Sequence, residues 1–96
     1  MIVSFGDSAT DDLYNGVSSA KARSFPNDIV KGARRKLAAL NAAISLEVLA
    51  LIPGNRLEAL KGDLVGCHSV RVNSQWRIVF TWDNGAHSVR LMDYHD

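Results

Sequence analysis

The sequence predicts an α+β fold, in which an N-terminal strand and helices pack against a C-terminal antiparallel sheet. Up to Pro53 the chain is rich in Ala and Leu at helical spacing, whereas β-branched and aromatic residues replace them afterwards. Short turns containing Asn or Gly separate the segments of the second half, and strands joined by tight turns must run antiparallel. Helices followed by such strands bury their apolar sides against one another, which is the α+β arrangement.

The N-terminal twenty residues are predicted to hold two short elements. Residues 2–5 are apolar enough to form a short strand that ends before Gly6. The stretch from Asp7 to Gly16 is acidic and rich in turn-forming residues, and it can hold one short helix.

The main helix is predicted over residues 28–43. Ser24 offers a polar cap and Pro26 fits a first helical turn, so both mark its start. Apolar residues recur at spacings of three and four, which gives the helix one buried side: Ile29, Ala33, Leu37, Leu40 and Ile44. A shorter helical segment over residues 46–51 ends at Pro53, which lacks the backbone donor that a helix interior needs.

Four strands are predicted after Pro53: Leu57 to Leu60, Ser69 to Val72, Trp76 to Trp82 and His87 to Tyr94. The third alternates with a period of two, as a half-buried strand does. One side carries large apolar residues (Trp76, Ile78, Phe80 and Trp82) and the other carries Gln75, Arg77 and Thr81. Asn73-Ser74 and Asp83-Asn84-Gly85 fit hairpin turns, since Asn and Gly tolerate a positive φ.

Length and composition indicate one soluble domain over residues 1–96. The chain has 47% hydrophobic and 22% charged residues, close to the averages for globular proteins. No apolar run could span a bilayer, and the first residues lack the basic region of a signal peptide, so we expect a cytoplasmic protein that does not enter a membrane. Cys67 is the single cysteine, which excludes an internal disulfide, and the three histidines show no metal-ligand spacing. No cofactor or metal is expected.

Positive charge is concentrated between Lys21 and Lys36, although the whole chain has a net charge of only +1. This segment holds six basic residues and one acidic residue, which is a local net charge of +5. Such a block could face an anionic partner, and Lys31, Arg34 and Arg35 on the main helix are the candidate RNA-binding residues. The alternative is an ordinary solvated helix face.

The C-terminal Asp93, Tyr94 and His95 form the densest cluster of groups able to transfer protons. Strand alternation puts Asp93 and His95 on one side and Tyr94 on the other, and the alternative is a solvated tail. Arg77 and Arg71 lie on neighbouring predicted strands. If the register places them opposite each other they could clamp a phosphate, because guanidinium donors match phosphate oxygens in pairs; otherwise they are solvated arginines.

Two further polar residues lie between or beside the predicted strands. Lys61 precedes Gly62 in a sequence that fits a simple turn, where it would be an exposed cation. Glu58 precedes an apolar segment and would face solvent by its local pattern. Cys67 and His68 are adjacent, so on a strand they point to opposite sides and do not share a metal.

The second half of the chain resembles the HigB toxins of bacterial type II toxin-antitoxin systems, which belong to the larger RelE/ParE superfamily. The resemblance is dense over residues 54–95, and the opening strand and the Ala- and Leu-rich helix fit in order and kind. The segments that carry it follow one another in a specific order: Asn55-Arg56-Leu57, Leu60-Lys61-Gly62-Asp63, Gly66, Ser69 to Asn73, Gln75-Trp76-Arg77-Ile78, Phe80 and the terminal Asp93-Tyr94-His95.

This resemblance implies a RelE-like toxin fold and an endoribonuclease that cuts mRNA in the decoding site of the 70S ribosome without a metal. In such cleavage the 2′-hydroxyl attacks the adjacent phosphate, so the enzyme moves two protons and stabilises an overcharged phosphate. Carried over by motif, Lys61 and Arg77 would stabilise the phosphate, while Asp93, Tyr94 and His95 would handle protons and position. Arg71 would add a contact to RNA.

One departure from the family concerns Glu58, since several HigB toxins have a histidine just before the Leu-Lys-Gly-Asp motif. A carboxylate can accept a proton, but it carries no positive charge and is repelled by a phosphate. Glu58 could act as the base, His95 could take over that role, or this toxin could cut slowly.

The resemblance also implies partners and leaves two other functions open. The expected partner is a HigA-like helix-turn-helix antitoxin. The toxin would associate with DNA only indirectly, through this antitoxin. A toxin of the same fold can instead block another target such as DNA gyrase, as the ParE branch does, because a fold does not determine a function. A weakly active toxin could serve mainly in antitoxin binding and repression of its own operon.

Overall fold

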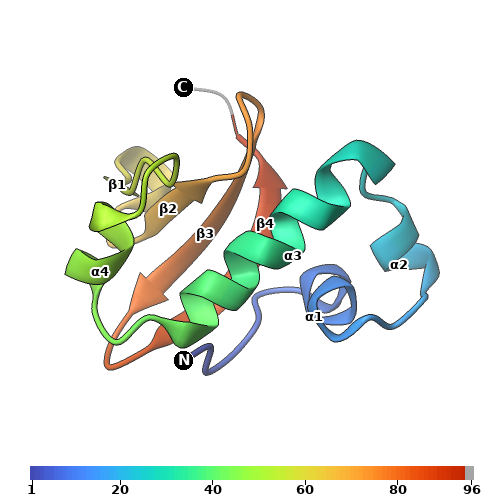
Figure 1. Cartoon of the computed structure of the whole chain (residues 1–96), viewed down its shortest axis with the longest axis horizontal. Coiled ribbons are helices and arrows are strands. Elements are labelled where there is room, and N and C mark those ends of the chain that lie inside the picture. Colours follow the sequence, from blue (N-terminus) through green and yellow to red (C-terminus); the bar gives the residue numbers. More distant parts are fainter. Residues whose placement is uncertain (95–96) are drawn as a thin grey trace.

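The chain folds as an α+β structure in which helices cover one face of an antiparallel sheet (Figure 1). The computed structural model describes residues 1–94. The helices are α1 (Ser8–Asn15), α2 (Ala20–Arg23), α3 (Asn27–Ala42), α4 (Leu46–Leu51) and the short 3-10 turn η1 (Gly62–Leu64). The strands are β1 (Glu58–Ala59), β2 (His68–Arg71), β3 (Trp76–Trp82) and β4 (Ala86–Asp93), arranged in the order β1-β2-β3-β4. The predicted fold class is therefore confirmed.

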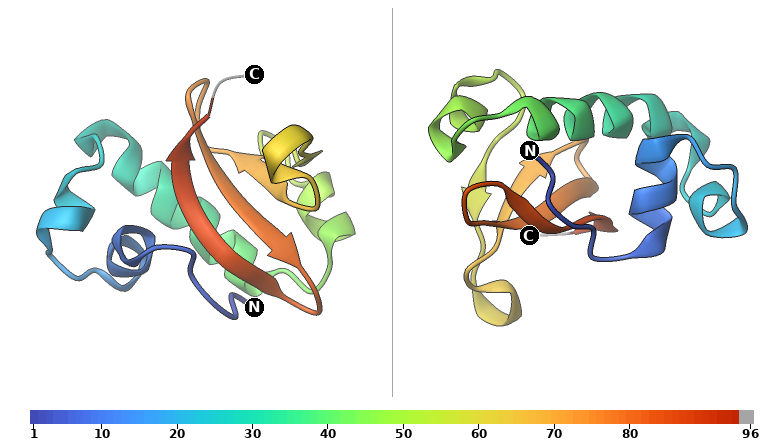
Figure 2. Two further views of the ribbon diagram at one scale, coloured as in Figure 1. Left: turned by 180° about the vertical axis from the view of Figure 1, so that it is seen from behind. Right: turned by 90° about the horizontal axis from the view of Figure 1, so that it is seen from below.

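Helix α3 runs diagonally across one face of the sheet, and the η1 turn projects on the opposite side (Figure 2). Ile29, Ala33, Leu37 and Leu40 of α3 are buried, as their spacing predicts. Ile44 was expected to continue this buried side, but it is 87% exposed because α3 ends at Ala42 and Ala43 turns to extended backbone.

The prediction of a continuous strand over residues 2–5 is wrong, although this segment does pair with the sheet. It runs parallel to β4 and forms two isolated bridges, Ile2 with Ala86 and Phe5 with Val89. Ser88 lies between the two bridged positions of β4 and has a positive φ of 53°. This left-handed residue, next to a register shift between β3 and β4, interrupts the ladder.

Helix starts differ from the sequence expectation at one place. The acidic stretch forms α1, with the side chain of Asp7 accepting a hydrogen bond from the backbone N–H of Thr10 at 2.8 Å. Ser24 does not cap α3. Its hydroxyl donates to the carbonyl of Lys21 and ends α2, a four-residue helix that the sequence did not reveal. Pro26 precedes α3 without a side-chain cap.

The sheet is more buried than its alternating pattern predicts. Ile78 and Phe80 of β3 pack under α3, and Trp76 meets Phe25 edge to face with 5.8 Å between ring centroids. On the other side, however, Val79 and Arg77 are also buried. On this side Arg77 contacts Glu58 of β1 and the backbone carbonyl of Arg56 before it, and β1 spans two residues rather than the four expected.

Within residues 1–94, no helix is long and apolar enough to cross a membrane.

Candidate active site

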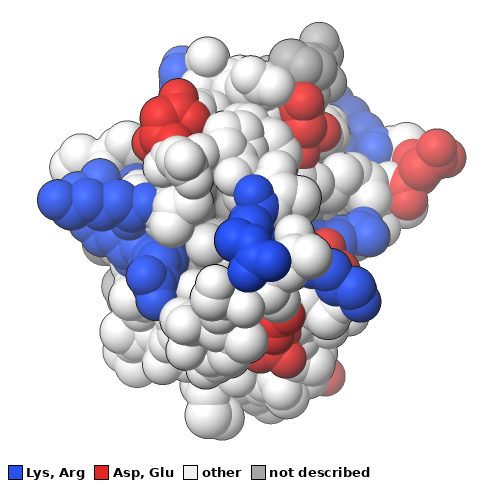
Figure 3. Space-filling model, turned by 90° about the vertical axis from the view of Figure 1, so that its right-hand side faces the viewer, with Lys and Arg blue, Asp and Glu red and all other residues white. Residues whose placement is uncertain are grey.

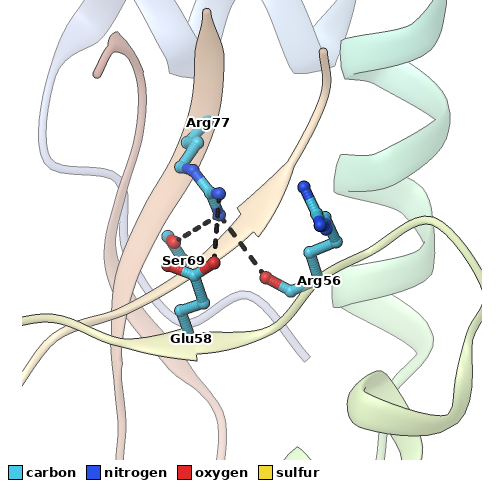
Figure 4. A network of polar contacts seen from close by, with 4 residues as sticks. All are labelled: Arg56, Glu58, Ser69 and Arg77. Atoms are coloured by element: carbon cyan, nitrogen blue, oxygen red, sulfur yellow. Dashed lines mark hydrogen bonds and ion pairs between the residues drawn. The ribbon is translucent and has the colours of Figure 1, made fainter. Parts of the chain in front are cut away.

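Arg77 lies at the centre of a polar network on the face of the sheet away from α3. It is only 6% exposed, and its guanidinium donates to three acceptors from two neighbouring segments (Figure 4). Nη1 contacts the hydroxyl of Ser69 at 3.0 Å and the carbonyl of Arg56 at 3.4 Å, and Nη2 contacts Glu58 Oε1 at 3.3 Å. A buried cation held by a fixed set of acceptors has a defined orientation, which suits it to bind an anion in paired geometry.

The sheet register builds this network from separate parts of the sequence. Glu58 is the partner of Ser69 across β1 and β2, while Arg71 is the partner of Arg77 across β2 and β3. The two arginines are therefore directly opposite each other on adjacent antiparallel strands, where side chains share one face. This is the register that a phosphate clamp requires.

Glu58 is engaged by Arg77 but remains open to solvent. Its side chain is 43% exposed, whereas that of Arg77 is 8% exposed. Because this pair combines one buried and one accessible partner, the carboxylate can leave while the guanidinium stays in place. Glu58 Oε1 accepts from Nη2, so its carboxylate lies against the guanidinium that was expected to bind a phosphate.

Lys61 lies apart from this network. It precedes η1 in the loop between β1 and β2, is exposed, and contacts none of the Arg77 acceptors within the described part of the chain. Gly62 follows with a φ of 65°, a conformation that favours glycine and turns the loop sharply.

The end of β4 brings one of the predicted proton-transfer groups to the same side as Arg77. Met92 pairs with Arg77, and the backbone N–H of Tyr94, two residues further, donates to the carbonyl of Gln75 at 2.8 Å. Asp93 pairs instead with Trp76 and accepts a hydrogen bond from the Gln75 side chain at 2.8 Å. By alternation Tyr94 shares the Arg77 face, whereas Asp93 belongs to the other side. His95 lies outside the described residues.

On the face at the α2 end, positive charge does not form one continuous patch (Figure 3). Seen from the α2 end, Lys and Arg side chains lie in separate groups with acidic side chains between them (Figure 3). Lys31, Arg34 and Arg35 are exposed on α3. Lys36, by contrast, donates to the buried side chain of Asn55. Burial, together with the neighbouring Arg35, lowers the pKa of Lys36 from its ordinary value.

Asn55 is a structural residue whose role the sequence did not reveal. It is 1% exposed, accepts from Lys36, and donates through Nδ2 to the carbonyl of Leu49 at 3.2 Å. The backbone carbonyl of Asn55 accepts a hydrogen bond from the backbone N–H of Arg71 at 2.6 Å. Asn55 thus ties α3, α4 and β2 together and fixes the segment that carries Arg56 and Glu58. Ser69, also missed, is fully buried and orients Arg77.

Among residues 1–94, no group of three or more His, Cys, Asp or Glu side chains is placed to hold a metal ion.

Comparison with known proteins identifies relatives over nearly the whole chain. A family model described as "RelE-like toxin of type II toxin-antitoxin system HigB" matches residues 3–95. The chain is 36% identical over 95 residues to Toxin HigB-1 of Vibrio cholerae serotype O1, covering 99% of this chain and 98% of that protein. It also superimposes on a chain of the YoeB-YefM complex from Staphylococcus aureus with a TM-score of 0.58, covering 100% of this chain and 97% of the other. Sequence identity in that superposition is 24%, so the match concerns the fold alone.

Proposed function

Since the chain belongs to the HigB family of RelE-like toxins of type II toxin-antitoxin systems, we propose that it is a ribosome-dependent endoribonuclease that cleaves mRNA during translation. Cleavage of messages in the decoding site would stop protein synthesis and growth. The toxin would act in the cytoplasm, where translating ribosomes are found, and would be neutralised by a helix-turn-helix antitoxin.

The observation that carries this proposal is the oriented guanidinium of Arg77. RNA cleavage without a metal requires cationic donors for the phosphate, because its oxygens gain negative charge as the 2′-hydroxyl attacks. Arg77 is held by Ser69 and by the Arg56 carbonyl, with Arg71 directly opposite. A fixed donor of this kind loses little entropy on binding, and removing one such donor typically costs about 3 kcal/mol of transition-state stabilisation.

The remaining roles follow from position. Tyr94 shares the Arg77 face and would position the RNA or transfer a proton. His95, which lies outside the described residues, would transfer a proton as its motif implies. Asp93, on the other side of β4, would support this end through Gln75 rather than contact the phosphate. Lys61 would approach from its exposed loop and add a second cation. DNA would not be cleaved, since it lacks the 2′-hydroxyl nucleophile.

Glu58 is better placed to compete with the phosphate than to act as the base. Its carboxylate accepts from the same Nη2 atom that a phosphate oxygen would need. Bound RNA would displace it toward solvent, which its exposure permits. This competition favours slow cleavage. It also supports a second candidate function, in which a weakly active toxin serves mainly to bind its antitoxin and to repress its operon.

Contacts to ribosomal RNA would come from the exposed cations of α3, with Lys31 and Arg35 one helical turn apart. Arg71 would contact the mRNA beside Arg77. Because the net charge is only +1, the affinity for free RNA should be low, and the ribosome would supply the binding energy.

The test is primer extension on a defined mRNA held on purified 70S ribosomes, with the same RNA free of ribosomes as control. We expect the toxin to cleave only the ribosome-bound mRNA and not the free RNA. Cleavage should be lost in Arg77→Lys, which keeps the positive charge but not the paired donors. Absence of cleavage in both samples would contradict the proposal, and a gyrase supercoiling assay would then test the binding-toxin alternative.

A further inference from the structure

A cavity of about 210 Å³ lies between α1, α2 and the beginning of α3, away from the Arg77 face. Its walls include four apolar side chains, Leu13, Val17, Phe25 and Val30, and two arginines, Arg23 and Arg34. This volume is below the range of about 300–1,000 Å³ that drug-sized ligands and cofactors occupy. It is suited instead to one or two side chains of another polypeptide.

Arg34 lies at this cavity beside the end of α1. Gly16 caps α1 with a φ of 72°, and a Cβ atom at that position would lie 2.8 Å from Nη2 of Arg34. The glycine therefore leaves the space in which the guanidinium rests, beside a helix C-terminus where a cation is favoured. Arg23 is fixed by its contact with Ser18 at 3.1 Å.

The charge of the cavity is entirely positive. No acidic residue lines it, and within residues 1–94 neither Arg23 nor Arg34 forms an ion pair. Val17 is also 50% exposed at its rim. Two guanidinium groups beside an open apolar wall complement a carboxylate next to an apolar side chain. A nucleic acid would pair with the arginines but would leave Val17, which is half exposed, without an apolar partner.

We propose that this cavity receives an acidic and apolar segment of the antitoxin. The choice of partner rests on the proposed function, since the toxin role implies a dedicated protein partner. The cavity lies on the side of the sheet that α3 covers, whereas the Arg77 network and the η1 turn lie on the opposite side (Figure 2). An antitoxin bound at the cavity would therefore leave the Arg77 network uncovered. Arg34 would then contact protein, while Lys31 and Arg35 would remain the cations that face RNA.

The test measures the affinity of purified toxin variants for the antitoxin encoded beside this chain, by titration calorimetry. Arg34→Glu and, separately, Val17→Asp should each weaken binding at least about tenfold, because each adds a negative charge where a carboxylate is expected. Two controls make matched changes outside the cavity. Arg35→Glu reverses a neighbouring charge on α3, and Ile44→Asp places an acid at another exposed apolar residue; both should retain wild-type affinity.

The result that would overturn the proposal is an equal effect of Arg34→Glu and Arg35→Glu, or no effect of either cavity variant. Melting temperatures exclude unfolding as the cause, and Val17→Asp provides an independent exposed position if Arg34→Glu fails to fold. Ribosome-dependent cleavage is measured separately without antitoxin, so failure of the nuclease proposal is distinguished from failure of the docking site. Loss of cleavage with unchanged antitoxin affinity in Arg34→Glu would assign the cavity arginine to RNA and contradict the proposal.

Discussion

Replacing Glu58 by glutamine separates the two roles that a carboxylate beside Arg77 can have. The substitution removes the charge and keeps the size of the side chain. If Glu58 competes with the phosphate for Nη2 of Arg77, Glu58→Gln frees the guanidinium and cleavage accelerates. If Glu58 is the general base, the same substitution removes the proton acceptor and cleavage falls by about 10²- to 10⁴-fold. The two hypotheses therefore predict opposite signs.

The expected acceleration follows from the strength of the Glu58–Arg77 pair. Its atoms are 3.3 Å apart, Arg77 is buried, and the Glu58 side chain is 43% exposed. Exposed pairs contribute up to about 1 kcal/mol, and loss of one partner of a fully buried pair costs about 3–5 kcal/mol. Arg77 keeps Ser69 and the Arg56 carbonyl in the variant, so we take about 1 kcal/mol, the upper end of the exposed range. This corresponds to about a fivefold change in rate at subsaturating ribosomes.

The assay is single-turnover cleavage of ribosome-bound mRNA, combined with urea denaturation of the free protein. We expect Glu58→Gln to cleave about fivefold faster and to lose about 1 kcal/mol of unfolding free energy, since the same contact stabilises the free fold. Glu47→Gln makes the same chemical change in the exposed first turn of α4. It should leave the cleavage rate unchanged, although loss of its charge at the helix N-terminus can lower the unfolding free energy by about 0.3–1 kcal/mol. A slower Glu58→Gln enzyme would refute the competition argument and assign Glu58 as the base.

Three further predictions test other contacts. Tyr94→Phe should slow cleavage by about 10²-fold, measured on ribosomes, without lowering stability, because the described hydrogen bond of Tyr94 is through its backbone. Asn55→Ala should lower the unfolding free energy by about 2 kcal/mol in urea titrations, since it leaves Lys36 and the Leu49 carbonyl without their buried partner. The pKa of Lys36 is lowered in the folded state by burial and by Arg35. Between that pKa and the ordinary lysine value of 10.5 the unfolded chain binds more protons, so rising pH stabilises the fold. Wild type should therefore gain unfolding free energy over Lys36→Met as the pH approaches 10.5, and a constant difference would contradict this.

The sequence predicts those parts of the fold that depend on local periodicity. The buried side of α3 and the inner side of β3 follow from spacings of 3.6 and 2, and the hairpin turns follow from Asn and Gly. Ile44 fits the helical spacing but lies beyond the last helical residue, and no local signal marks that the chain extends at Ala43. Helix ends are set by competing caps, as Ser24 shows by closing α2 instead of opening α3.

The candidate site was predictable in membership but not in arrangement. The motifs identify Arg71 and Arg77, and an antiparallel register determines that they are opposite each other. The burial of Arg77 and its pairing with Glu58 depend on β1, whose two residues pair with β2 only because Asn55 fixes the preceding segment. A contact between residues 19 apart, made across three strands, has no periodic signature in the sequence. The motifs include Ser69 and Asn55 but do not reveal their structural roles, because small polar residues in strands and turns are common and only burial distinguishes these two.

The acceptors of Arg77 differ in charge and exposure, and this difference affects how the site would bind its substrate. The neutral acceptors, the Ser69 hydroxyl and the Arg56 carbonyl, hold Nη1, whereas the charged and exposed acceptor holds Nη2. A phosphate can therefore replace Glu58 without disturbing the orientation of the guanidinium. This exchange weakens binding of every RNA by the same free energy, about 1 kcal/mol. A message positioned by the ribosome has a high effective concentration at the site and tolerates that loss, while free RNA does not. Glu58→Gln should accordingly raise the affinity for free RNA, measured by titration, by about the same factor as it raises the cleavage of ribosome-bound mRNA.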